Sequence, residues 1–296
     1  MMSNSNRKFN IFANIFLALA VLFCITPLIL LVISSFTDNN TLIRNGYSFW
    51  PQKFSFSAYA YLLKSRELIF RAYGMSFIVT IIGLVFSLTL TTMLGYAISK
   101  TDIPGRRLLT FFVFFTMLFN GGLVPTYLMY TGTFHIKNTI LALLLPNLMV
   151  RAYYVMLVRS FFQTSLPEEV LEAAAIDGAS ETQTFRKIAV PMAKPIIATV
   201  ALFVMILYWN DWQNGLYYIT TKTELYTIQN LLNRMIQEIQ FLSSNATMGQ
   251  SIDLSSIPSG TARMAIAVIG ILPIAILYPF IQNNFAKGIT LGAVKG

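Results

Sequence analysis

Long apolar stretches alternate with polar segments along this chain of 296 residues. A helix that crosses a bilayer needs about 20 predominantly apolar residues. Six stretches meet that requirement, at residues 11–36, 72–99, 108–131, 138–158, 195–220 and 263–285. The pattern therefore predicts an all-α, polytopic membrane protein with six transmembrane helices.

The first apolar stretch has a basic start, Arg7 and Lys8, which resembles a secretory signal. Its apolar run is longer than the 7–15 residues of a signal-peptide core, and it ends without a small-x-small cleavage site. We therefore expect it to remain as a membrane anchor.

Composition agrees with a lipid environment. Hydrophobic residues make up 55% of the chain and charged residues 11%, whereas soluble domains carry roughly 25% charged residues. The single cysteine, Cys24, excludes an intrachain disulfide, and with the single histidine, His135, it argues against a metal centre. The net charge of +9 suits anionic headgroups and the positive-inside rule better than nucleic acid.

Orientation follows from the short loops, which weigh most in the positive-inside rule. Residues 100–107 carry three basic side chains and residues 131–138 carry one. We therefore predict cytoplasmic N- and C-termini, a cytoplasmic loop at 159–194 and extracytoplasmic loops at 37–71 and 221–262. All of them belong to one transmembrane domain, residues 1–296.

The cytoplasmic loop has the signals of two short helices. Ser165 followed by Glu168 is a capping-box pattern for a first helix, and Gly178 is suited to its left-handed end. A second helix is expected from residue 180 to 188, before Pro191. Five acidic residues within fourteen positions indicate charge-assisted contacts with a basic partner.

The spacing in this loop resembles the EAA motif, E-A-A-x3-G-x9-I-x-L-P, of bacterial ABC-importer permeases. The matching positions are Glu172, Ala173, Ala174, Gly178, Ile188 and Pro191. Val190 departs from the motif's leucine, which is a mild apolar exchange. The context of the motif is similar to the carbohydrate-uptake, MalG-like branch, and the C-terminal tail resembles its poly- and oligosaccharide subgroup.

This resemblance implies a type I ABC-importer permease that couples to a separate ATPase through the loop. The implied coupling residues are Glu169, Glu172, Ala173, Ala174, Ile176, Asp177, Gly178, Ala179, Ile188 and Pro191, with the tail residues Lys295 and Gly296 reaching the ATPase interface. The motif implies that Glu172 forms an ion pair with the ATPase and that Ala173 and Ala174 pack in its groove.

The same resemblance implies the partners of the chain. They are a MalF-like companion permease, two ATP-binding subunits that carry ATP and Mg²⁺, and an extracytoplasmic sugar-binding protein. The chain has no phosphate-binding loop of its own, so we expect no enzymatic activity, no cofactor and no catalytic or metal site in it.

Polar residues within the apolar stretches are candidates for the substrate path, because such residues usually face a cavity or a partner. They are Asn120, Trp209, Asn210, Asp211, Trp212 and Asn214, and also Arg151, whose role stays open. Asn210 and Asn214 are spaced to share one helical face. Hydrogen bonding between helices is an equally good interpretation of this set, and the Gly121-Gly122 pair predicts a hinge, a kink or a break.

Two other classes of protein are alternatives to a permease. An ion-gradient-driven secondary transporter needs titratable groups and broken helices in mid-membrane, for which Asp211 and the Gly121-Gly122 pair are weak support. A membrane-embedded enzyme needs a nucleophile–base pair, paired carboxylates or a metal cluster, and the sequence offers none of these. The EAA loop favours the permease, since a secondary transporter has no use for an ATPase-docking helix.

Overall fold

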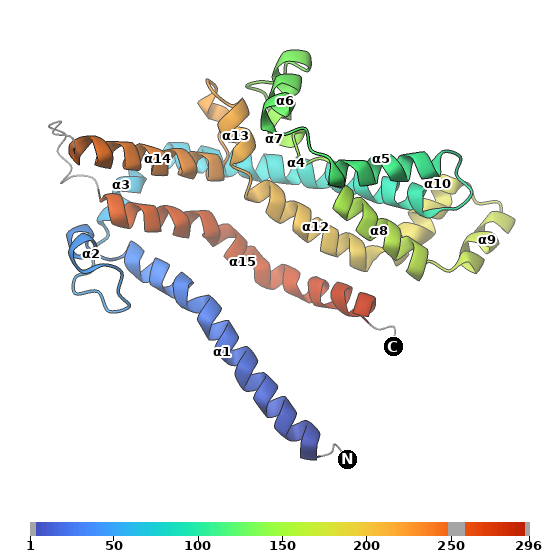
Figure 1. Cartoon of the computed structure of the whole chain (residues 1–296), viewed down its shortest axis with the longest axis horizontal. Coiled ribbons are helices and arrows are strands. Elements are labelled where there is room, and N and C mark those ends of the chain that lie inside the picture. Colours follow the sequence, from blue (N-terminus) through green and yellow to red (C-terminus); the bar gives the residue numbers. More distant parts are fainter. Residues whose placement is uncertain (1–3, 248–257, 294–296) are drawn as a thin grey trace. The chain divides into compact units, whose positions relative to one another are not determined.

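The computed structural model describes residues 4–247 and 258–293, which are mostly helical (Figure 1). They form two compact units. The first comprises Met1–Leu68 and Leu232–Pro273, and the second comprises Ile69–Leu231 and Ile274–Gly296. An all-helical architecture with several long apolar helices, as the sequence predicts, is confirmed for the described part of the chain.

In the first unit, helix α1 (Asn4–Ser35) contains the first apolar stretch. Its spanning part, Phe9–Ser35, has no buried side chain in its most apolar window. The short helices α2 (Asn39–Asn45) and α3 (Ser57–Leu63) follow. The first unit also holds most of α14 (Ile228–Thr247) and the first part of α15 (Ser259–Ala293).

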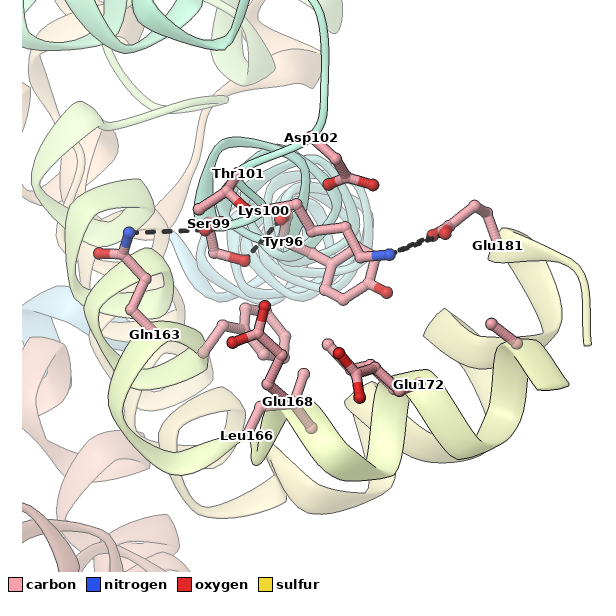
Figure 2. Close-up of a pocket in the computed structure, with 13 residues that line it drawn as sticks. Tyr96, Ser99, Lys100, Thr101, Asp102, Gln163, Leu166, Glu168, Glu172 and Glu181 are labelled. Carbon is pink, nitrogen blue, oxygen red and sulfur yellow. Dashed lines mark hydrogen bonds and ion pairs between the residues drawn. The ribbon is translucent and has the colours of Figure 1, made fainter.

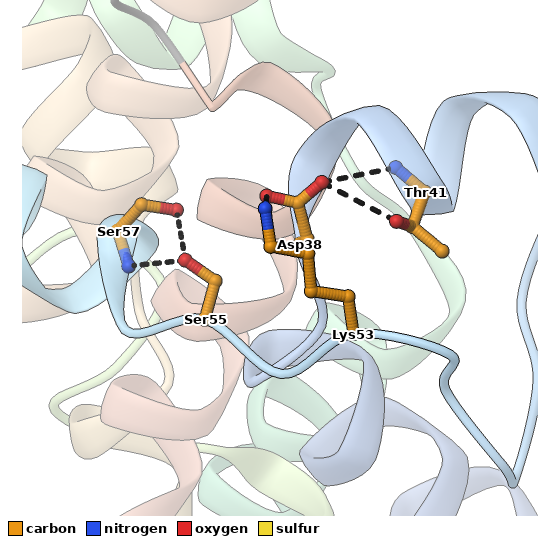
Figure 3. A network of polar contacts seen from close by, with 5 residues as sticks. All are labelled: Asp38, Thr41, Lys53, Ser55 and Ser57. Atoms are coloured by element: carbon orange, nitrogen blue, oxygen red, sulfur yellow. Dashed lines mark hydrogen bonds and ion pairs between the residues drawn. The ribbon is translucent and has the colours of Figure 1, made fainter.

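Polar contacts fix the segment between α1 and α3 (Figure 3). The Asp38 carboxylate caps α2 by accepting hydrogen bonds from the backbone N–H and the hydroxyl of Thr41, both at 3.3 Å, and Lys53 approaches it at 3.9 Å. The N–H of Ser57 donates to the hydroxyl of Ser55 at 3.2 Å at the start of α3. These polar contacts add to the ring contacts of Phe36 with Phe56 and Tyr59, which hold the same segment together.

The second unit is built around α4 (Arg66–Ser99), which buries a face of small residues. These are Ser76, Thr80, Gly83, Ser87, Thr91 and Gly95. A Cβ on Gly83 would overlap the ring of Tyr208, and one on Gly95 would lie 2.7 Å from Val158. Close helix packing in membrane proteins depends on such small residues.

The helices that pack on this face are α8 (Ala152–Ser165) and α12 (Lys194–Trp209). Tyr208 reaches the end of the short helix α7 (Leu141–Leu144), where its hydroxyl donates to the carbonyl of Leu144 at 2.9 Å. Ser76 accepts a hydrogen bond from the N–H of Ile228 at 2.8 Å. Small side chains on α4 therefore position the aromatic residues of α12 that lie nearest to the predicted substrate path.

The third and the fifth of the predicted crossings are interrupted. The third is divided into α5 (Arg106–Leu118) and α6 (Leu123–Leu128) with the π-helical turn η1 (Met129–Thr133), and the two parts are bent by 119°. Gly122, with φ 84°, makes the break. The fifth is divided at residues 210–212 between α12 and α13 (Gln213–Tyr218).

The prediction that residues 138–158 form one spanning helix is wrong. Only α7 (Leu141–Leu144) is helical before a non-helical segment at residues 145–150, and α8 begins at Ala152. The interruption includes Pro146, which has no backbone N–H for a helix. Among the described residues four helices are long and apolar enough to cross a membrane, or five if the bent pair is one crossing, so the count of six remains a prediction.

Candidate coupling loop and polar pocket

The loop that follows α8 begins with helix α9 (Glu168–Ile176). Glu168 and Glu169 lie in its first turn, where negative charge is favoured by the helix dipole. The predicted capping box at Ser165 is wrong, because Ser165 is the last residue of α8 and the N-cap of α9 is Pro167, which makes no side-chain cap. The extended backbone of Leu166 and Pro167 separates the two helices.

The end of α9 confirms the role predicted for Gly178, which has φ 77°. The N–H of Ala179 donates to the carbonyl of Ala174 at 2.9 Å, and the N–H of Gly178 donates to that of Ala175 at 3.0 Å. This pair of bonds is a Schellman motif, which satisfies the last carbonyls of the helix. A Cβ on Gly178 would meet nothing within 4 Å, so glycine is needed here for its backbone and not for space.

A second capped helix starts directly after this turn. Ser180 accepts a hydrogen bond from the N–H of Gln183, and the Gln183 side chain accepts one from the N–H of Ser180, which makes a capping box for α10 (Glu181–Thr184). Sequence reasoning missed it, although Ser-x-x-Gln at 180–183 is the same signal that was read at Ser165.

The chain then continues through the π-helical turn η2 (Phe185–Ala189) into α11 (Val190–Met192) and α12. Pro191 lies in the first turn of α11, where its missing N–H costs least. The second helix predicted for residues 180–188 is therefore present, and it leads into the fifth apolar stretch without a long connection.

Most of the predicted coupling residues lie on the surface of the described chain. Glu169, Glu172, Ala173, Ile176, Asp177 and Pro191 are exposed, and Ile176 has 85% of its surface accessible. Ala179 and Ile188 are half-buried. Ala174 is only 6% exposed within the described chain. Lys295 and Gly296 lie outside the described residues.

A cavity of about 560 Å³ lies between α9 and the end of α4 (Figure 2). On one side Glu168 and Glu172 of α9 line it, and on the other Lys100 bridges the cavity to α10. The Lys100 Nζ lies 2.7 Å from both carboxylate oxygens of Glu181 and 5.3 Å from the ring centre of Tyr96. This pair links the coupling loop to α4, and sequence reasoning missed it because its members are 81 positions apart.

Lys100 stays charged in this position. Partial burial lowers its pKa, but the hydrogen bond to Glu181 and the neighbouring Tyr96 raise it, and the net direction is upward. Only 12% of the Lys100 side chain is exposed, against 70% for Glu181. The lysine is thus the buried half of the link, and the glutamate is the half that meets solvent.

The predicted substrate-path residues separate into two groups. Trp209 is 4% exposed and packs edge-on against Phe77 at 5.2 Å. Asn210 follows α12 as its C-cap and accepts a long hydrogen bond from Gln229 at 3.5 Å. The prediction that Asn210 and Asn214 share one helical face is wrong, because the helix breaks between them.

Asn120 and Asn214, by contrast, meet at one small cavity of about 240 Å³. Asn214 is buried, and its amide donates to the carbonyl of Pro146 at 2.9 Å. Asp211 accepts a hydrogen bond from the N–H of Asn214 at 3.4 Å and so helps to begin α13. Trp212 is 36% exposed, and neither Asp211 nor Trp212 lines this cavity.

Long apolar helices, a loop of two short capped helices and a polar break are features typical of a membrane-embedded transport subunit. The chain belongs to the family of binding-protein-dependent transport system inner membrane components, whose sequence pattern matches residues 105–291. The family resemblance inferred from the EAA motif is thereby confirmed, and the alternative of a secondary transporter finds no support in these comparisons.

Several relatives match along nearly the whole chain. The polygalacturonan/rhamnogalacturonan transport system permease protein YtcP of Bacillus subtilis is 34% identical over 98% of this chain and 99% of its own. Protein LplC of the same organism is 34% identical over 99% of this chain and 97% of its own. A bacterial ABC transporter involved in the import of the acidic polysaccharide alginate has a chain with a TM-score of 0.77 and 29% identity, covering 96% of this chain and 99% of that one.

Proposed function

We propose that this chain is one permease subunit of an ATP-driven importer of oligo- or polysaccharides in a bacterial cell membrane. The single observation that carries the proposal is the EAA loop, in which α9, the turn at Gly178 and α10 present an exposed docking helix. Membership of the binding-protein-dependent family supports the importing direction. The names of the relatives support a saccharide cargo.

The proposed assembly has four kinds of component. This chain forms half of the translocation pathway as one domain, 1–296, with six crossings and both termini in the cytoplasm, and a companion permease forms the other half. Two ATP-binding subunits carry ATP and Mg²⁺ and do the hydrolysis, so this chain is not an enzyme. An extracytoplasmic sugar-binding protein delivers the carbohydrate.

The docking surface is the outer face of α9. Val170, Ala173 and Ile176 follow each other at intervals of three residues and are all exposed, so they lie on one side of the helix. Carboxylates of Glu169, Glu172 and Asp177 border this face, and these favour a partner groove with a basic rim. Ile176 is its most exposed large apolar side chain and would fill the groove.

Movement of the docked ATP-binding subunit would then reach the membrane helices through two connections. The Lys100–Glu181 ion pair connects the loop to α4, and η2 with α11 connects it directly to α12. Rigid-body motion of a docked subunit is a common way of rocking packed helices.

The test is reconstitution of the chain with its three kinds of partner in proteoliposomes. We expect the ATP-binding subunits to co-purify with the chain and uptake of oligosaccharide to require ATP. Ile176→Ala should weaken co-purification, whereas Ile43→Ala, which truncates a 64% exposed isoleucine in the proposed extracytoplasmic loop, should leave it unchanged. Gradient-driven uptake by the purified chain alone would refute the proposal.

A further inference from the structure

The cavity at the break between α5 and α6 is lined by side chains that bind hydroxyl groups. Asn120, Thr126, Asn147, Gln213, Asn214 and Tyr217 contribute to it. Sites for drug-sized ligands occupy roughly 300–1,000 Å³, so a cavity of about 240 Å³ is suited to a single sugar ring of a longer chain. Four of these six residues come from two interruptions of the apolar stretches, at 119–122 and 145–150, and from the start of α13.

Several of these amides have free hydrogen-bonding capacity. The side chains of Asn147 and Gln213 make no hydrogen bond within the described chain. Asn120 uses only its Oδ1, which accepts the N–H of Gly122 at 2.8 Å. An amide offers two donors and one acceptor, so these three side chains present both kinds of group to a ligand. Asn147 also has φ 59°, a left-handed backbone that asparagine tolerates better than most residues.

The rear of the cavity is fixed before any ligand arrives. Asn214 is held by the carbonyl of Pro146, and Tyr218, which is 2% exposed, stacks against Tyr127 with ring centres 5.6 Å apart. The side chains at the rear of the cavity are therefore already ordered and need not rearrange when a ligand binds, which lowers the entropic cost of binding.

Arg151 does not itself line this cavity, but it contacts Asn147, which does. The Arg151 Nε donates to the carbonyl of Asn147 at 3.0 Å, and Arg151 also interacts electrostatically with Asp211. The Asp211 carboxylate is already used by the backbone N–H groups of Gln213 and Asn214. The terminal nitrogens of Arg151 have no hydrogen-bond partner in the described part of the chain. A guanidinium left free in an apolar stretch is suited to a carboxylate, which it can bind through two parallel bonds.

From this juxtaposition we propose that the cavity binds one uronate unit of an acidic oligosaccharide during its passage. Asn120, Asn147 and Gln213 bind its hydroxyl groups, and Arg151 binds its carboxylate. The inference rests on the proposed importer function and narrows its cargo to sugars that carry carboxyl groups. It also gives the open Arg151 a role that hydrogen bonding between helices does not supply.

The lone cysteine makes a direct test available, because a Cys24→Ser chain has no thiol. In that background we introduce Asn120→Cys in the cavity or Thr133→Cys as a control, an exposed position that does not line it. The reconstituted complex is labelled with a water-soluble maleimide, without ligand or with millimolar trigalacturonate or its carboxyl-reduced neutral counterpart. Labelling rates are compared with and without Arg151→Gln.

We expect trigalacturonate to slow labelling at position 120 at least threefold and to leave position 133 unchanged. The neutral trisaccharide should protect much less, and Arg151→Gln should bring the two sugars to the same weak protection. Absence of protection by trigalacturonate, or equal protection by both sugars with Arg151 in place, would overturn the inference. ATP-driven uptake in the same vesicles reports on the importer function separately, so the two proposals fail independently.

Discussion

The coupling loop and the buried face of α4 both depend on glycine, but for opposite reasons. Gly178 has open space around it and a left-handed backbone, whereas Gly83 lies within a regular helix against the Tyr208 ring. The structure of the loop follows from local rules of helix ends, so a substitution at Gly178 strains the backbone. The structure around α4 follows from packing between distant segments, so a substitution at Gly83 displaces a residue of another helix.

The largest effect should come from filling the α4 contact. Gly83→Leu would force Tyr208 away from Gly83 and from the Leu144 carbonyl that it binds. Overpacking of this kind costs about 1–3 kcal/mol or more. We expect a lower melting temperature and less assembled complex in the membrane. Gly74→Leu on the same helix, where a Cβ meets nothing within 4 Å, is the matched control, and an equal loss there would contradict the packing argument.

A smaller effect is expected when the turn of the coupling loop is strained. Gly178→Val places a β-branched residue at φ 77°, which costs about 1–2 kcal/mol. Membrane insertion should be normal, but ATP hydrolysis should continue with reduced uptake. Gly178→Asn should retain most of the coupling because asparagine tolerates the left-handed region. If both variants transport equally well, the backbone of this turn does not matter for coupling.

Removing the capping box comes next. Ser180→Ala should destabilise α10 by about 1 kcal/mol, the usual cost of an N-cap, and hydrogen exchange at the N–H of Gln183 should become faster. Ser180→Asp should restore protection because a carboxylate also caps. Ser165→Ala is the decisive comparison. It should have little effect on α9, and a loss of α9 protection would show that the cap is at Ser165 after all.

The smallest effect should come from the ion pair between the two regions. Glu181→Gln should cost about 1 kcal/mol, because the side chain that changes is 70% exposed and glutamine can still accept a hydrogen bond from the largely buried Lys100. Since the pKa of Lys100 is raised, its contribution is complete below the ordinary lysine value and is lost only as pH rises through the raised one. Coupling of wild type should therefore be flat from pH 7 to 9, and a decline across that window would contradict the assignment.

The features that the sequence could predict follow the same division between local rules of helix ends and packing of distant segments. Gly178 and the two helices of the loop were predictable because capping and left-handed turns depend on a few neighbouring residues. The Lys100–Glu181 pair and the contact of Gly83 with Tyr208 join residues far apart in the chain, so a local pattern carries little signal for them. The fourth crossing was mispredicted because hydropathy counts apolar residues without detecting that Pro146 and the residues around it interrupt the helix.

The polar residues of the apolar stretches show an intermediate case. Asn120 and Asn214 line a cavity, while their place on the substrate path stays a prediction. Asn147 and Gln213 line the same cavity and were overlooked, because their position depends on two breaks that bring separate segments together. Trp209 packs against Phe77, and its place on the substrate path also stays a prediction. Residue type alone does not distinguish these outcomes.

In the most apolar window of α1 no side chain is buried within the described part of the chain, so packing inside the subunit does not dictate the shapes of these side chains. Substitutions among leucine, phenylalanine and isoleucine in this window should leave the fold of the subunit unchanged, whereas a charged residue would be unfavourable in the lipid. This segment is therefore free to drift in sequence, and a single reporter group attached at Cys24 should disturb nothing while it senses the viscosity and composition of the surrounding bilayer.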